Sequence, residues 1–156
     1  MLPKPVTIEF EEFVITTDKA SIQVERVHQW LSQESYWSKN IPLSVVQDSV
    51  EHSFCMGAFY KGQQIAYARC ITDYTTFAYV ADVYVEEAYR GRGLSKKMMD
   101  LLMEQDWMQR LRRIMLATLD AHELYKKYGF VTPAFPERFM EISRPGIYGD
   151  TGNVCN

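Results

Sequence analysis

The sequence predicts a single α/β (α+β) domain, residues 1–156, built on a mixed sheet with helices on both faces. The 156 residues suit one domain, and no repeat, low-complexity tract or linker divides them. Strand-like and helix-like apolar patterns alternate along the chain. The run from Thr76 to Val85 is apolar on both faces except at Asp82, which is typical of a central strand.

The N-terminal third is predicted to contain one strand and two helices. Residues 13–17 form a short run of β-forming side chains. Asp18 then offers an N-cap for a helix over 20–32, whose apolar residues fall on one side. Pro42 opens a second helical pattern that ends near His52.

The middle of the chain has the pattern of an antiparallel meander. Apolar residues at 53–60 and β-forming residues at 64–72 flank a turn at Lys61-Gly62-Gln63. A second turn, Asp73-Tyr74-Thr75, leads into the strand at 76–85. Three consecutive antiparallel strands are therefore expected.

The C-terminal third is predicted to alternate helix and strand. A helix is expected over 93–106, a buried strand over 113–119, and a short helix over 121–128 that a glycine ends. A final pair of strands, at 130–131 and 138–142, is expected around two prolines. These elements complete a sheet with helices on both faces.

Composition and charge argue against several classes of protein. The formal net charge of −3 gives no general basic surface for nucleic acid. No run approaches the ~18 apolar residues of a membrane helix, and the N-terminus lacks a signal-peptide layout. Cys55 and Cys70 lie in apolar runs and, with Cys155, make an odd number. We therefore expect a cytoplasmic protein with reduced thiols, no metal, and no nucleic-acid or membrane partner.

The start of the helix at 93–106 carries an unusual concentration of positive charge. A helix N-terminus already presents unpaired N–H groups and a partial positive charge, so cations there are unfavourable unless an anion completes the site. Glycines beside them would let the backbone approach a phosphate. A solvated turn with surface cations is the alternative. The residues concerned are Arg90, Gly91, Arg92, Gly93, Lys96 and Lys97.

This loop carries neither the dinucleotide motif G-x-G-x-x-G nor the P-loop motif. Arg90-x-x-Gly93-x-Ser95, after a strand and opening a helix, instead resembles the Q/R-x-x-G-x-G/A signature of GNAT acetyltransferases. Leu124 to Phe130 resembles a second motif of that family. The resemblance implies the GNAT fold, with a mostly antiparallel central sheet, and acetyl-CoA as cosubstrate. Ser95 departs from the Gly/Ala position, but it is small and keeps its N–H.

The resemblance also implies how acetyl-CoA is held. Val83, Tyr84 and Val85 would pair through their backbone with the pantetheine arm, and an N–H near Val83 would polarise the thioester carbonyl. Lys96, Lys97 or Arg92 would reach the remaining phosphate. The pyrophosphate would lie on the backbone of Arg90, Gly91, Arg92, Gly93, Leu94, Ser95 and Lys96.

Four side chains are candidates for work near the reacting groups. Tyr125 stands at the position of the family's general acid, and a phenol with a pKa near ~10 can protonate a leaving thiolate, although Tyr125 could instead be a packing residue. Asp82 is either the general base or the ion-pair partner of Arg69. His122 is a further titratable group near the cleft mouth. Asp120 either contacts the cofactor arm or caps the following helix.

The acceptor is expected to contact Tyr36 and Trp37, adjacent aromatics in a polar loop that can line a pocket or hold an ammonium ion. The leading hypothesis is an acyl-CoA-dependent N-acyltransferase that acetylates a primary amine of a small molecule or peptide by direct attack in a ternary complex. A CoA-binding sensor without transfer activity, or a nucleotide-binding protein, would use the same anion site. A homodimer is suggested by analogy with other small family members.

Overall fold

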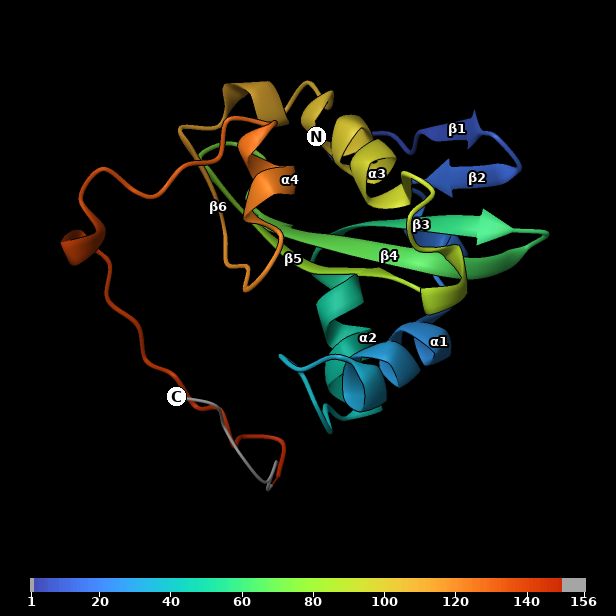
Figure 1. Cartoon of the computed structure of the whole chain (residues 1–156), viewed down its shortest axis with the longest axis horizontal. Coiled ribbons are helices and arrows are strands. Elements are labelled where there is room, and N and C mark those ends of the chain that lie inside the picture. The colour runs from blue at the N-terminus through green and yellow to red at the C-terminus, as the bar shows by residue number, and fades with distance from the viewer. Residues whose placement is uncertain (1, 150–156) are drawn as a thin grey trace.

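The computed structural model describes residues 2–149, which contain one six-stranded sheet with helices on both faces (Figure 1). The strands lie across the sheet in chain order, and neighbours are antiparallel except β5 and β6, which are parallel. The predicted mixed, mostly antiparallel sheet is therefore confirmed. The strands are β1 (Thr7–Phe10), β2 (Phe13–Thr16), β3 (Phe54–Tyr60), β4 (Gln63–Thr72), β5 (Phe77–Val85) and β6 (Arg113–Leu116).

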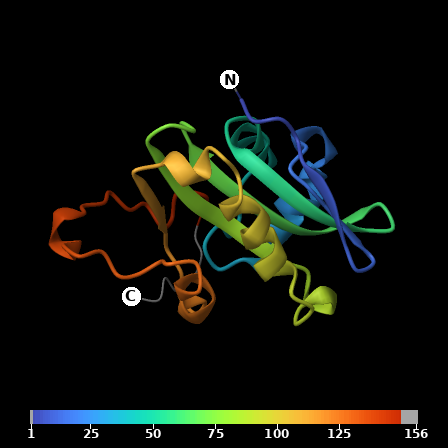
Figure 2. The same ribbon diagram turned by 90° about the horizontal axis from the view of Figure 1, so that it is seen from above.

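Helices cover both faces of the sheet (Figures 1 and 2). On one face lie α1 (Val24–Gln29) and α2 (Leu43–Glu51), and on the other lie α3 (Leu94–Met103) and α4 (His122–Lys126). The chain continues from α1 into a π-helical turn at Trp30–Glu34. Short 3-10 turns occupy Lys19–Ser21, Glu87–Tyr89, Met108–Arg110 and Pro136–Arg138.

Two apolar clusters fill the space between the sheet and its helices, one on each face. Because successive strand residues point to opposite faces, neighbours on one strand join different clusters. On β3, Met56 packs on the α3 side and Cys55 on the α1–α2 side. Cys55 and Cys70 are buried free thiols, as predicted, and Cys155 lies outside the described residues.

The N-terminal region differs from the prediction in two ways. β1 is missing from the sequence-based prediction, although Thr7–Phe10 alternates polar and apolar residues and pairs with β2 as a hairpin. The helix predicted over 20–32 begins only at Val24. Asp18 caps the preceding 3-10 turn instead, because its carboxylate accepts a hydrogen bond from the backbone N–H of Ala20 at 3.1 Å.

The predicted strand pair at 130–131 and 138–142 is wrong for this chain. The segment 131–149 forms a C-terminal arm that contains no strand and only the 3-10 turn at Pro136–Arg138. The strand predicted over 113–119 also ends early, at Leu116. The arm does contain apolar residues, but its backbone forms no strand pair and these side chains are exposed.

A β-bulge interrupts the pairing of β4 with β5. Between the pairs Tyr67–Tyr84 and Arg69–Ala81, one residue of β4 lies opposite two residues of β5. The bulged Asp82 has φ of 52°, in the left-handed region that L-residues seldom adopt. Such strained positions persist only where their surroundings hold them, and they cluster at functional sites.

The parallel pairing of β5 with β6 ends at Val80 and Leu116, just before the bulge. The last residues of β5, 81–85, therefore continue without a partner strand on the β6 side. This divergence of two neighbouring strands opens the sheet at one end, where the site lies.

We expect Ile15 and Val14, neighbours on β2, to respond differently to truncation. Ile15 is fully buried, whereas Val14 is 39% exposed. Ile15→Ala should lower the free energy of unfolding by about 2–5 kcal/mol, and Val14→Ala by less than about 1 kcal/mol. Urea denaturation followed by circular dichroism measures both, and equal losses would contradict the described burial of the two faces.

Candidate functional site

A cavity of about 980 Å³ opens where β5 and β6 diverge. Its walls come from the loop after the π-helical turn (34–38), from β5 (79–85) and from the segment after β6 (116–121). The lining is completed by Arg69, Ile71, Arg90, Ser95 and Tyr125. Most of the site residues expected from the sequence therefore share one cavity, although they come from distant parts of the chain.

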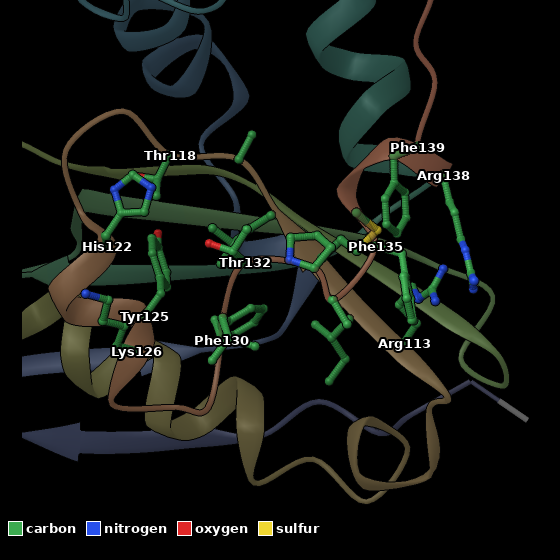
Figure 3. A pocket seen from close by; sticks show the side chains of 17 residues that line it. Arg113, Thr118, His122, Tyr125, Lys126, Phe130, Thr132, Phe135, Arg138 and Phe139 are labelled. Atoms are coloured by element: carbon green, nitrogen blue, oxygen red, sulfur yellow. The ribbon is translucent and has the colours of Figure 1, made fainter.

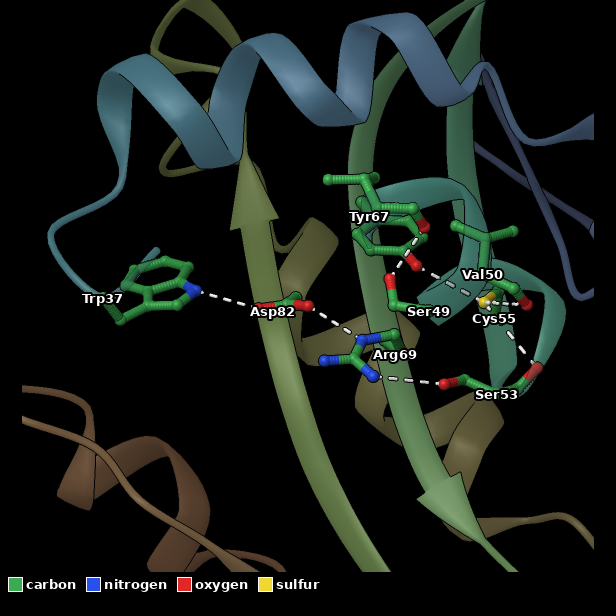
Figure 4. A network of polar contacts seen from close by, with 9 residues as sticks. Trp37, Ser49, Val50, Ser53, Cys55, Tyr67, Arg69 and Asp82 are labelled. Atoms are coloured by element: carbon green, nitrogen blue, oxygen red, sulfur yellow. Dashed lines mark hydrogen bonds and ion pairs between the residues drawn. The ribbon is translucent and has the colours of Figure 1, made fainter. Parts of the chain in front are cut away.

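Asp82 is held from two sides (Figure 4). Its carboxylate accepts a hydrogen bond from Arg69 Nε at 2.8 Å and another from Trp37 Nε1 at 2.9 Å. Arg69 also donates to Ser53 Oγ at 3.2 Å. The Asp82 side chain is only 8% exposed, so the ion pair with Arg69 offsets the cost of burying its charge. The structural pairing expected as one alternative is present, and use of Asp82 as a base stays a prediction.

Trp37 and Tyr36 form part of the cavity wall, and their contact with an acceptor stays a prediction. Their rings pack edge to face with centroids 5.0 Å apart. Through its indole N–H, Trp37 also ties the loop to the bulge of β5. Trp37 therefore positions the loop as well as lining the cavity.

Tyr125 projects from α4 and is buried. Burial raises the pKa of its phenol, and the nearby charge of Asp120 and the neighbouring Tyr36 raise that pKa further. The hydroxyl therefore stays protonated at neutral pH. A protonated phenol at the wall of this cavity is suited to donate a proton to a leaving group.

Glu34 is a functional candidate that the sequence analysis missed. It lines the cavity and accepts a hydrogen bond from the hydroxyl of Tyr84. Burial and Glu34 together raise the pKa of Tyr84 to about 12. The Tyr84 ring stacks on Trp30, and the Arg90 guanidinium lies 5.5 Å from the centroid of the Tyr84 ring. A single acid at a helix end gives no sequence signal, because only the fold brings it to β5.

The Arg/Gly loop connects β5 to α3 with two left-handed glycines. Gly91 and Gly93 have φ of 75° and 80°, and Gly93 occupies the N-cap position of α3. The first N–H groups of a helix have no partner within it, so those of the first turn of α3 are available to an anion. Arg90 and Ser95 line the cavity, and Arg90 Nε donates to the carbonyl of Val85 at 2.8 Å.

The positive charge at this helix start is partly balanced within the chain. Arg92 forms an ion pair with Glu12 of the β1–β2 hairpin, and Lys96 pairs with Asp100 at 3.1 Å. Lys97 Nζ lies 6.0 Å from the ring centroid of Phe10. The cation cluster therefore does not by itself require an external anion, and the stronger indication is the backbone geometry of Gly91 and Gly93.

Asp120 and His122 lie on different cavities. Asp120 lines the large cavity, and the interpretation of this residue as a helix cap is wrong, because no side chain caps α4 at Ala121. The Ala121 N–H is instead bonded to Thr118 Oγ1 at 3.0 Å. His122 lines a second cavity of about 590 Å³ (Figure 3). Tyr125 borders both cavities, as do residues 116–118.

Two classes of feature are absent from residues 2–149. These residues contain no group of three or more His, Cys, Asp or Glu side chains arranged to hold a metal ion. None of their helices has the length and apolar character needed to span a membrane.

A family model described as Acetyltransferase (GNAT) family matches residues 24–130. The chain is also 46% identical to a candidate GNAT acetyltransferase of Xanthomonas campestris pv. campestris, whose crystal structure aligns with a TM-score of 0.87 over 91% of this chain and 100% of that chain. A candidate acetyltransferase of Gibberella zeae is 29% identical over 147 residues, 81% of this chain and 82% of that protein.

A more distant solved structure shares the fold. It is a candidate acetyltransferase of Clostridium acetobutylicum crystallised with acetyl-CoA, and it aligns with a TM-score of 0.53 at 16% identity, over 90% of this chain and 95% of that chain. At this identity the likeness concerns the fold alone.

We expect the phenol of Tyr125 to titrate above the ordinary tyrosine range, because burial disfavours its ionised form. At pH 10, where an unperturbed phenol is about half ionised, Tyr125 should remain mostly protonated. The Cζ chemical shift of labelled tyrosine, assigned with Tyr125→Phe, measures this titration. A midpoint at or below pH 10 would show that the phenol is not desolvated.

Proposed function

Because this chain belongs to the GNAT acetyltransferase family, we propose that it transfers an acetyl group from acetyl-CoA to a primary amine of a small molecule or peptide, by direct attack in a ternary complex. One observation carries the proposal. The Tyr125 phenol, the divergent end of β5 and the start of α3 border one cavity. An acid, a run of backbone that has no partner on its β6 side and a helix N-terminus therefore meet in one place.

The residues present fit the pyrophosphate of acetyl-CoA. Gly91 and Gly93 turn the chain in the left-handed conformation and carry no side chains. A Cβ added to Gly91 would meet nothing within 4 Å, so a phosphate can approach the backbone there. Ser95 keeps its backbone N–H in the first turn of α3. In the proposal, the backbone of residues 90–96 holds the pyrophosphate, and residues 83–85 hold the pantetheine arm.

The proposed step forms a C–N bond and breaks a C–S bond. The amine nitrogen attacks the thioester carbonyl carbon, and the negative charge that develops on the carbonyl oxygen is stabilised by a backbone N–H near Val83. Collapse of the intermediate expels the CoA thiolate, which takes the proton of Tyr125. The amine gives up its own proton to a base in the site.

Asp82 is the proposed base. Both of its oxygens already accept hydrogen bonds, and the bond from Trp37 comes from the more exposed partner. An acceptor amine could replace the indole as a donor while Arg69 holds the other oxygen. His122 is the second candidate, and its place on the neighbouring cavity puts it on the far side of Tyr125. The buried free thiols favour a reducing compartment, and we propose the cytoplasm.

A CoA-binding sensor without transfer activity is the second candidate function. The observation that favours it is the ion pair of Asp82 with Arg69, which gives the carboxylate a structural role that needs no catalysis. The two candidates share cofactor binding and differ in turnover, so a screen of amine acceptors separates them.

Calorimetric titration of the purified chain with acetyl-CoA, then CoA, then ATP tests the cofactor. The proposal expects micromolar binding of both CoA species and little response to ATP, because only the CoA species carry the pantetheine arm. Failure to bind acetyl-CoA would end the acyltransferase proposal.

Gly93→Val should abolish acetyl-CoA binding, because a β-branched side chain cannot easily adopt φ of 80° and would change the backbone conformation of the turn before α3. Gly62→Val is the matched control. Gly62 also has a positive φ, of 79°, but it lies in the β3–β4 turn. Calorimetry should show binding to Gly62→Val and none to Gly93→Val, with circular dichroism confirming that both fold. Normal binding to a folded Gly93→Val would remove the loop from the cofactor site.

Tyr125→Phe should lower kcat by about 10²–10⁴-fold, because the thiolate loses its proton donor. The dissociation constant of acetyl-CoA should stay nearly unchanged, since the ring is retained. Tyr128→Phe, which alters a neighbouring tyrosine bonded to Asp100, is the control and should keep most activity. Full activity of Tyr125→Phe would remove Tyr125 from the acid role.

A further inference from the structure

Four large apolar side chains are exposed to solvent around the large cavity. Single exposed apolar residues need no explanation, but several that gather at the wall of one cavity indicate a surface that another molecule covers. These four come from three parts of the chain: the loop after the π-helical turn, β4 and the segment after β6. They are Tyr36 at 63% exposed, Trp37 at 42%, Ile71 at 43% and Leu119 at 73%. We call them the apolar rim.

Ile71 of the rim lies beside the ion pair of Arg69 and Asp82. It follows Arg69 by two residues on β4, so both side chains point to the same face of the sheet. On β5, Tyr79 is the direct partner of Ile71 in the antiparallel register and also lines the cavity. The wall that holds the charged pair therefore continues as an apolar surface.

The aromatic part of the rim reaches both of the side chains proposed to move protons. Trp37 donates from Nε1 to the Asp82 carboxylate at 2.9 Å (Figure 4). Tyr36 packs edge to face on Trp37. Burial and the charge of Asp120 raise the pKa of Tyr125, and Tyr36 is close enough to raise it further. An acceptor whose amine lies between Asp82 and Tyr125 would therefore have its remaining atoms against these rings.

The charges of the cavity favour a cation and leave no free cationic group for an anion on the acceptor. Among the described residues that line it, three carry carboxylates and two carry guanidinium groups: Glu34, Asp82 and Asp120, with Arg69 and Arg90. Arg69 is already paired with Asp82. Arg90 begins the loop proposed to bind the pyrophosphate. An acceptor with a carboxylate or phosphate beside its amine would therefore lie among negative charges that no cation balances.

We propose that the acceptor is an arylalkylamine, a primary amine joined by a short alkyl chain to an aromatic ring, with no anionic group. The inference rests on the proposed function and narrows its acceptor to one chemical class. The ammonium ion enters beside the carboxylates, and the aromatic body covers the apolar rim, where rings pack edge to face or offset. At about 980 Å³ the cavity lies at the upper end of the range for small-molecule sites, so it has room for this body beside the acetyl end of the cofactor.

Two matched comparisons of amines test the acceptor class. 2-Phenylethylamine and ethanolamine differ in the aromatic body, whereas 2-phenylethylamine and phenylalanine differ only in a carboxylate. Calorimetric titration into the full chain, with and without CoA, measures the dissociation constants in the absence of turnover. 2-Phenylethylamine should bind at least about tenfold more tightly than ethanolamine, because it buries an aromatic group. It should also bind at least about tenfold more tightly than phenylalanine, whose carboxylate is repelled.

A double variant that makes the rim more polar tests where the aromatic body lies. Ile71→Thr combined with Leu119→Ser should weaken the binding of 2-phenylethylamine at least about fivefold, because less apolar surface is buried. Val14→Thr combined with Leu2→Ser is the matched control, since Val14 and Leu2 are also exposed, at 39% and 72%, but line neither cavity. The control should bind 2-phenylethylamine as the unaltered chain does. Circular dichroism checks that both variants fold, and the comparison of amines decides if the double variant does not.

Equal binding of the three amines, tighter binding of phenylalanine, or a folded double variant that binds like the unaltered chain would overturn the inference. Acetyl transfer is followed separately, by release of the CoA thiol. A preference for 2-phenylethylamine without thiol release would support this ligand class and end the acyltransferase proposal. Thiol release with several amines and no preference for 2-phenylethylamine would support acyl transfer and overturn the inference.

Discussion

The ion pair between Arg69 and Asp82 stabilises the feature on which the site depends. Asp82 adopts a left-handed φ that costs on the order of 1–3 kcal/mol, and such strain persists only where neighbouring contacts hold it. Arg69 supplies one such contact from β4, the strand that the bulge faces, and Trp37 supplies a second from the loop after the π-helical turn. One bulged residue therefore joins β4 and β5 to a loop that lies far away in the chain.

The bulge has consequences on both sides of β5. Toward β4 it shifts the register, so that Tyr84 faces Trp30 and Glu34 beneath the α1–α2 layer. Toward β6, pairing stops at Val80, and the unpaired end of β5 becomes a wall of the large cavity. The turn at Gly91 and Gly93 then brings α3 back with its N-terminus near the same opening. Backbone geometry, more than any cluster of charges, defines this cavity.

The second open edge of the sheet has a different character. The large cavity opens between β5 and β6, two strands of the same sheet, and polar side chains line the space between them. At β6 the sheet simply ends, with apolar side chains half-covered and an apolar arm standing beyond them. Tyr125 lies between these two openings, on the five-residue helix α4.

The sequence alone determined the parts of this protein that depend on local pattern. Runs of apolar and β-forming residues define the meander from β3 to β5, and the glycines at 91 and 93 mark the left-handed turn before α3. Helix starts were less predictable, because Asp18 can cap a 3-10 turn as well as an α-helix. The prediction of strands at 130–131 and 138–142 was wrong, because a β-pattern indicates only that a segment can pair. A strand forms only where another strand lies beside it.

Only the tertiary structure decided the contacts between distant segments. Asp82 could be assigned either to catalysis or to an ion pair until its distance to Arg69 was known. Asp120 could have been a cap until α4 was seen to begin without one. Glu34 carried no signal at all, since its meeting with Tyr84 depends on the register shift at the bulge. The physical reason is common to these cases: a side chain's role is set by the groups that surround it, and those groups come from parts of the chain that only folding brings together.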